Sequence, residues 1–177
     1  MKTTAVTPVV LGLLALGPRS GYDIKTVVDR STRFFWAASY GQIYPELRRL
    51  EDEGLIEGED ASNGARGRRT YKLTAAGHEA LRAWLLGSTT TVELRDESLL
   101  RLFFADAIPR EYGLMLLEGR KLGHEAYLAE LRAIDARPGE DPPFVDLVLR
   151  WGIAFNEWGA QWCEEQLQRL RLDPSSD

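Results

Sequence analysis

Hydrophobic residues in the middle of the N-terminal half repeat with the period of an α-helix. Ile43, Leu47 and Leu50 are spaced at i, i+4 and i+7, which places them on one face that must be buried. Ser39 and Gln42 match the S-x-x-Q capping box, which satisfies free backbone amides at a helix start. The pattern therefore predicts an amphipathic helix that begins at this box.

The opposite face of the predicted helix is small and polar. Gly41, Pro45 and Arg48 point away from the apolar face, and Gln42 and Tyr44 lie on its flanks. Little bulk and one fork-shaped cation suit close approach to the floor of a DNA major groove. Pro45 removes a backbone amide and its ring meets the carbonyl of Gly41, so we expect a local distortion there rather than a helix end.

Two short strands and a turn follow this helix. Gly54 matches the glycine that often follows a helix end, and Leu55-Ile56 begins an extended segment. Asn63-Gly64 and Gly67 mark a turn, and residues 70–73 form the returning strand. A helix followed by such a hairpin is the order of elements in a winged helix-turn-helix.

This turn is basic, with Arg66, Arg68 and Arg69 inside a span of four residues. Arginine on a hairpin tip is commonly just solvated. Directly after a helix suited to a groove, we expect these three side chains to contact the DNA backbone or minor groove.

Further helices flank the hairpin. Residues 4–16 are nearly all apolar and predict a first helix that is buried on most sides. Ser20 and Asp23 form a second capping box, and Thr74 caps a helix after the hairpin. The buried side of that later helix is predicted to consist of Leu81, Trp84 and Leu85.

A polar stretch, GSTTT at 87–91, separates two patterned regions. We therefore expect two domains, 1–88 and 89–177. The second is predicted to be all helical, with helices at 96–107, 109–136 and 144–172.

Four aromatic residues form a stripe along the last predicted helix. Trp151, Phe155, Trp158 and Trp162 step by 4, 3 and 4 residues, which aligns them on one seam. Such a seam is typical of a helix that packs against another helix. Leucine would serve that purpose equally well, so the three indoles also fit the wall of a pocket for a flat, apolar effector. Both interpretations stay open.

Charge is divided unevenly between the two halves. The total of −5 consists of +2 in residues 1–90 and −7 in residues 91–177. Because salt limits exposed charges to a range of about 8–10 Å, the local charge decides phosphate contact, and the total does not exclude DNA. In the second half, the acidic excess favours cationic over anionic ligands.

Several other classes of protein are disfavoured. No run approaches the ~18 apolar residues of a membrane span. Lys2 and the apolar run Val9–Leu16 have the outline of a signal peptide, but one lysine is a poor basic region and the run is short. The single Cys163 cannot form an internal disulfide, and a cytoplasmic location is expected.

Nothing in the sequence assembles a catalytic site. His78 and His124 lie on predicted polar helix faces, where we expect them to be solvated, and Cys163 is expected to be a structural thiol. No nucleophile–base pair, carboxylate dyad or metal-ligand spacing is found, so we expect no enzyme, no metal and no cofactor.

The central motifs resemble those of the PadR family of bacterial transcriptional regulators. The string S-x-G-Q-I-Y-P-x-L-x-R-L-E-x-x-G-L-I spans 39–56. Three neighbouring strings agree with it, LGLLALGPRSGYDI at 11–24, FFWAAS at 34–39 and YKLTAAGHEALRAWL at 71–85. The match covers the first half, and the second half resembles the family's dimerisation domain only in length, helicity and aromatic content.

This resemblance implies a mainly α-helical protein with an N-terminal winged helix-turn-helix, a two-stranded wing and an all-helical C-terminal dimerisation domain. It implies a homodimeric DNA-binding transcriptional repressor. The aromatic seam of Trp151–Trp162 adds the hypothesis that a small aromatic or apolar effector binds there and releases the repressor from DNA. The residues that match the family's groove-facing motif are Tyr22, Ser39, Gly41, Gln42, Tyr44, Pro45 and Arg48.

Within that set, Ser39 and the helix N-terminus would hold a phosphate, and Gln42, Tyr44 and Arg48 are candidates for base edges. The alternative is a winged-helix protein-interaction module that does not bind DNA. An acidic helix face would favour that alternative, whereas Arg48 and the turn arginines do not.

Overall fold

The computed structural model divides the chain into two compact units, Met1–Thr91 and Val92–Asp177. The predicted domain boundary after residue 88 lies outside the residues that the structure describes. The described residues are 4–17, 19–30, 32, 36, 40–60, 69–87, 96–136 and 142–172.

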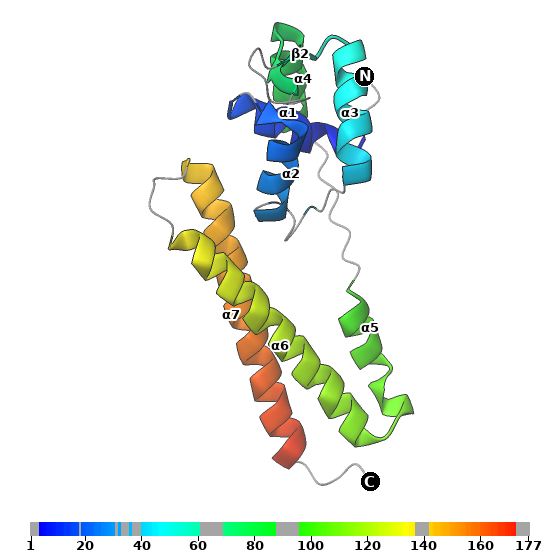
Figure 1. The fold of residues 1–177 in the computed structure, drawn as a ribbon. Coiled ribbons are helices and arrows are strands. Elements are labelled where there is room, and N and C mark those ends of the chain that lie inside the picture. The colour runs from blue at the N-terminus through cyan, green and yellow to red at the C-terminus, as the bar shows by residue number, and fades with distance from the viewer. Residues whose placement is uncertain are drawn as a thin grey trace. The chain divides into compact units, whose positions relative to one another are not determined.

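The first unit consists of short helices and a small sheet (Figure 1). Its elements, in chain order, are α1 (Thr7–Ala15), β1 (Arg19–Ser20), α2 (Gly21–Arg30), α3 (Tyr40–Asp52), β2 (Ile56–Asp60), β3 (Arg69–Leu73) and α4 (Ala75–Leu85). α1 is buried on most sides, as predicted, and Val10 and Leu11 are almost fully enclosed. α2 begins at the predicted capping box, in which the Ser20 amide donates to Asp23 Oδ2 (3.0 Å) and the Asp23 amide donates to Ser20 Oγ (3.3 Å).

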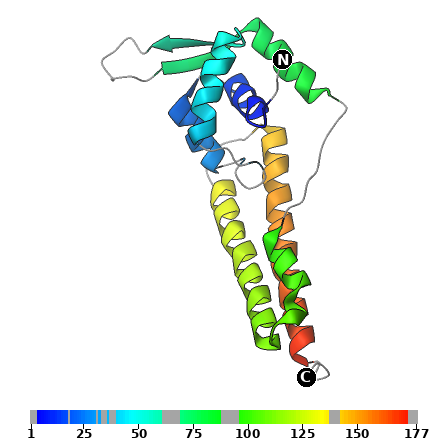
Figure 2. The same ribbon diagram turned by 90° about the vertical axis from the view of Figure 1, so that its right-hand side faces the viewer.

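The sheet has three antiparallel strands in the order β1-β3-β2. The hairpin of β2 and β3, which we call the wing, was predicted, and Figure 2 shows it extending away from the helices of its unit. The third strand was missed. β1 pairs Arg19 with Tyr71 and Ser20 with Thr70. Two residues are too few to show the alternation of a strand, and Ser20 also belongs to the capping box.

The predicted cap of α4 is confirmed, because Thr74 Oγ1 accepts a hydrogen bond from the Gly77 amide at 3.1 Å. Gly77 also lies against the chain before β2, since a Cβ there would be 2.0 Å from the Leu55 carbonyl oxygen. The predicted buried side was only partly right. Leu81 is buried, but Trp84 and Leu85 are exposed, because the elements of this unit cover only the first turns of α4.

The second unit contains α5 (Glu97–Phe103), a 3-10 helix (Ala105–Ala107), α6 (Arg110–Asp135) and α7 (Pro143–Leu172). α6 and α7 agree with the predicted helices. The single helix expected over 96–107 is wrong, since it ends at Phe103 and tightens into the 3-10 turn. Pro109 forces Ile108 into an extended conformation (φ −129°, ψ 161°), so no α-helix can continue through it.

α6 and α7 pack side by side as an antiparallel pair, visible in Figures 1 and 2. Lys121 on α6 pairs with Glu164 on α7 at 2.8 Å, and further along Arg132 pairs with Glu157 at 2.6 Å. The apolar contact between these helices is small. Its fully buried members within the described residues are Leu117, Leu131, Cys163 and Leu167.

His124 differs from its prediction, because it is buried between α6 and α7 instead of solvated. Its Nδ1 lies 3.0 Å from Asn156 Oδ1, and its ring packs edge-on against Phe155. The ring fits there because Gly159 has no side chain, and a Cβ at that position would lie 2.6 Å from the imidazole. Within the described residues, no helix is long and apolar enough to cross a membrane.

Candidate nucleic-acid interface

The apolar face of α3 is the anchor of the candidate site. Ile43, Leu47 and Leu50 are each 0% exposed and belong to the core that α1 and α2 share with the sheet, as the spacing predicted. α3 ends at Asp52, and Gly54 follows with φ 70°, which is the left-handed conformation expected of a terminating glycine.

The opposite face of α3 is open to solvent. Gly41, Gln42, Tyr44, Pro45 and Arg48 are all exposed, so the structure brings together five of the predicted DNA-binding residues. The helix continues through Pro45, as expected from the unbroken apolar period. Within the described part of the chain, Arg48 forms no ion pair.

Tyr22 lies next to this face, at the start of α2. Its side chain is exposed, and the preceding residue, Gly21, packs directly under the ring of Tyr44, since a Cβ at Gly21 would lie 2.7 Å from Tyr44 Cε1. The predicted contributions of Ser39, Arg66 and Arg68 fall outside the described residues.

Arg69 does not lie on the turn, as its sequence position suggested, but is the first residue of β3. Its guanidinium binds Glu51 Oε1 at 2.6 Å and Asp60 Oδ1 at 3.0 Å. Hydrogen bonds from the Arg69 guanidinium to Glu51 first, and then to Asp60, raise the pKa of Arg69 above its ordinary value. The positive charge of this side chain is thus already engaged within the protein.

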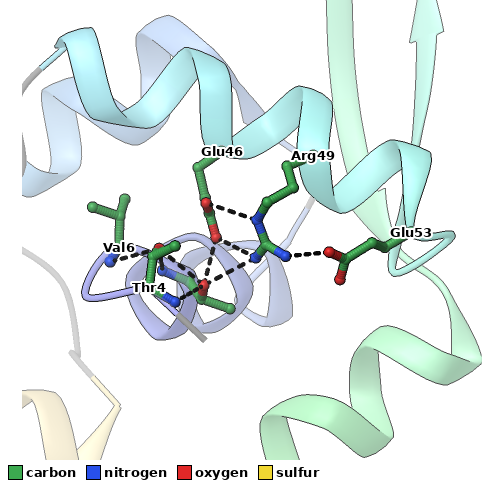
Figure 3. A network of polar contacts seen from close by, with 6 residues as sticks. Thr4, Val6, Glu46, Arg49 and Glu53 are labelled. Carbon is green, nitrogen blue, oxygen red and sulfur yellow. Dashed lines mark hydrogen bonds and ion pairs between the residues drawn. The ribbon is translucent and has the colours of Figure 1, made fainter. Parts of the chain in front are cut away.

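A polar network holds α3 to the start of α1 (Figure 3). Glu46, which is 5% exposed, accepts two hydrogen bonds from Arg49, at 2.7 Å to Oε1 and 3.1 Å to Oε2. Glu46 Oε1 also accepts a hydrogen bond from the buried hydroxyl of Thr7. Arg49 continues to Glu53, and the amides of Val6 and Thr7 are capped by the hydroxyl of Thr4.

Electrostatics in this network favour the charged forms. Burial alone would raise the pKa of Glu46, but hydrogen bonds from Arg49 and Thr7 and the charge of Arg49 outweigh it, so the pKa lies below its ordinary value. Hydrogen bonding to Glu46 raises the pKa of Arg49 in turn. The network is therefore an ion pair at neutral pH.

Sequence reasoning missed Glu46, Arg49 and Thr7. The spacing of Glu46, Arg49 and Glu53 at i, i+3 and i+7 could have indicated an ion-paired stripe along the helix. Nothing local indicated that Thr7 would meet Glu46, because 39 residues separate them.

The predicted aromatic seam exists on α7, in the second unit. Trp151 and Phe155 stack with ring centroids 5.4 Å apart, and the contacts continue to Trp158 at 6.3 Å and on to Trp162 at 6.5 Å. The first three side chains are exposed and Trp162 is half-buried. The seam is therefore a continuous aromatic surface along α7. Among the described residues, no group of three or more His, Cys, Asp or Glu side chains could hold a metal ion.

Two family models match the two units in turn. The Transcriptional regulator PadR-like family matches residues 10–83, and Virulence activator alpha C-term matches 94–171. The negative transcriptional regulator PadR of Bacillus subtilis (strain 168) is 34% identical over 125 residues, which cover 70% of this chain and 69% of PadR. The chain belongs to the PadR-like family of transcriptional regulators.

Solved structures of the PadR family agree. The crystal structure of Bacillus subtilis PadR in complex with operator DNA has a TM-score of 0.84 at 29% identity and covers 94% of this chain and 99% of that chain. The complex of the same protein with p-coumaric acid has a TM-score of 0.77 at 29% identity and covers 96% and 97%. These neighbours confirm the winged helix-turn-helix and the helical second unit, and they are transcriptional regulators rather than enzymes.

The buried Glu46 ion pair gives the stability of the chain a defined pH dependence. Glu46→Gln should lower the free energy of unfolding at pH 7 by about 2 kcal/mol, because Arg49 loses a charged, buried partner. A lowered pKa means that the contribution is present above the ordinary value of 4.5 and is lost as the pH falls below it. Urea unfolding between pH 7 and pH 3 should show the difference from wild type shrinking below about pH 4.5.

Glu53→Gln is the matched control, since Glu53 binds the same arginine but is exposed. It should change the free energy of unfolding by less than about 1 kcal/mol. A wild-type advantage over Glu46→Gln that stayed constant down to pH 3 would show that the ion pair does not stabilise the fold.

Proposed function

We propose that this PadR-family regulator is a homodimeric repressor that binds an operator in double-stranded DNA and is released by a small aromatic or apolar effector. The observation that carries the DNA-binding part is the outward face of α3. A rigid apolar anchor lies on one side of this helix, and an exposed surface with little bulk and a cation lies on the other.

In this proposal, α3 enters the major groove, and its exposed side chains have two different roles. Gly41 and Pro45 allow close approach, while Gln42, Tyr44 and Arg48 reach base edges. Tyr22 would contact the backbone beside the groove. Ser39 at the helix start and Arg66 and Arg68 in the turn are proposed as phosphate contacts.

A relative supports two parts of the proposal, repression and the binding of operator DNA. PadR of Bacillus subtilis is described as a negative regulator, and it has been crystallised with operator DNA. The rival hypothesis, a winged-helix protein-interaction module, is favoured by an acidic α3 face. The five exposed residues of that face include one arginine and no acid.

Dimerisation is supported by the second unit. Its buried core is small, while large apolar side chains are exposed on each of α5, α6 and α7. Phe103 is 78% exposed, Trp151 59% and Trp158 60%. Surfaces of this kind are typical of subunit interfaces. A single winged helix reads only a few base pairs. A dimer would present two copies of α3 and could recognise two half-sites.

The effector part rests on the aromatic seam. Planar rings stack well on exposed indoles, and Bacillus subtilis PadR binds p-coumaric acid, an aromatic acid. The acidic excess of residues 91–177 instead favours a cationic ligand. Both charge types therefore belong in the test.

Arg48→Ala should weaken binding to the operator by about 1–3 kcal/mol, as expected for the loss of a base contact, with a much smaller effect on random DNA. The operator is first identified by sequencing genomic DNA that co-purifies with the protein. Fluorescence anisotropy at fixed salt then compares the two DNAs. Arg82→Ala removes an equal charge from the exposed end of α4 and should leave the operator affinity unchanged. An equal loss on both DNAs would show that Arg48 does not read the sequence.

Trp158→Glu should convert the dimer into a monomer, because it places a charge at the centre of the seam. Sedimentation equilibrium on the full chain measures this directly. Gln168→Glu introduces the same charge on an exposed position of the same helix, beyond the end of the aromatic line, and should remain dimeric. A dimer that Trp158→Glu does not weaken would place the interface elsewhere.

An aromatic effector should quench tryptophan fluorescence and weaken operator binding by about 5–150-fold, the range of typical allosteric coupling. The panel contains p-coumaric acid and matched neutral and cationic aromatic compounds. Trp158→Leu should abolish the quenching, whereas Trp84→Leu, on α4 in the first unit, should retain it. Quenching without any change in operator affinity would show a ligand site that does not control DNA binding.

A further inference from the structure

One carboxylate joins the C-terminal end of α3 to the wing. Glu51, on the last turn of α3, accepts a hydrogen bond from the Gly58 amide on β2 at 3.0 Å and another from Arg69 on β3 at 2.6 Å. Arg69 also binds Asp60 at 3.0 Å, and these two residues face each other across the strand pair. We call Glu51, Gly58, Asp60 and Arg69 the wing clasp.

Gly58 makes this arrangement possible. A Cβ at that position would lie 2.3 Å from Arg69 Nε and 2.7 Å from Glu51 Oε1. The Arg69 side chain therefore lies directly over the Gly58 backbone. Its guanidinium is also 5.9 Å from the centre of the Tyr71 ring, which is opposite Gly58 in the sheet. The cation is thus held on the sheet surface by contacts to both strands and to α3.

We propose that the wing clasp positions the wing relative to α3, and that Arg69 acts in DNA binding as a positioning residue instead of a phosphate contact. This inference rests on the proposed DNA-binding function. Two carboxylates lie within 3.0 Å of the Arg69 guanidinium, so its charge is offset before a phosphate approaches. A two-stranded hairpin is weakly stable alone and needs such support.

The two roles predict opposite effects for Glu51. If Arg69 contacts phosphate, removing Glu51 frees its charge and strengthens DNA binding, and Arg69→Ala lowers the salt slope of binding by about one unit. If the clasp positions the wing, Glu51→Ala weakens operator binding as Arg69→Ala does. Because both variants break the same wing clasp, the double variant should bind the operator no more weakly than either single variant.

Arg69→Lys separates charge from geometry. Lysine keeps the cation but cannot bridge two carboxylates with a rigid fork. A phosphate contact would survive this change, whereas the clasp would not. Gly58→Ala disrupts the clasp without altering any charge, because the added Cβ displaces the Arg69 side chain.

The experiment measures operator affinity and its salt slope for the full chain and the variants Glu51→Ala, Arg69→Ala, Arg69→Lys, Gly58→Ala and the double alanine variant. We expect each to lose about tenfold in operator affinity, within the range of coupling between residues in contact. The salt slope should stay at the wild-type value. Glu59→Ala, which removes an acid of β2 paired with Lys72, is the control and should not weaken binding.

Hydrogen exchange gives a direct structural readout. The Gly58 amide should exchange faster in Glu51→Ala, because its acceptor is removed, while the core of the unit keeps its protection. Stronger binding by Glu51→Ala together with wild-type affinity of Arg69→Lys would overturn the clasp. The proposed function is tested separately, because Arg48→Ala would still weaken binding to the operator far more than binding to random DNA if only the clasp were wrong.

Discussion

The orientation of α3 is the constraint on which the first unit depends. A helix can bury one face only, and Ile43, Leu47 and Leu50 determine which face it is. Burial of these three residues leaves Gly41, Pro45 and Arg48 facing outward, whatever the neighbouring loops do. The exposed surface therefore owes its geometry to residues that never reach it.

Apolar packing alone does not fix how the neighbouring elements attach to α3. Two acids on this helix add directional contacts on either side. Glu46 binds Arg49 and Thr7 and so ties the helix to the start of α1, while Glu51 binds β2 and β3. Hydrogen bonds of this kind are geometrically specific even where they add little free energy, since exposed ion pairs are individually weak.

Much of this fold could be predicted, because local patterns determine it. The helical period of α3, the Ser20–Asp23 capping box and the Thr74 cap depend on residues within one or two turns, and each is confirmed. Three of the failures share the opposite property. β1, the burial of His124 and the position of Arg69 each depend on a partner distant in sequence, such as Tyr71, Gly159 or Glu51.

The candidate DNA-binding face could be predicted for the same reason, whereas the aromatic seam shows the limit of such reasoning. A repeat of 4, 3 and 4 residues establishes that Trp151, Phe155, Trp158 and Trp162 share one side of α7, and the contacts between successive rings agree. The repeat does not identify the partner. α6 covers the side of α7 that contains Gly159, Cys163 and Leu167, so Trp151, Phe155 and Trp158 stay exposed. A second copy and a flat ligand both bury aromatic surface, and they need not exclude each other, because a ligand can bias a dimer whose interface it shares.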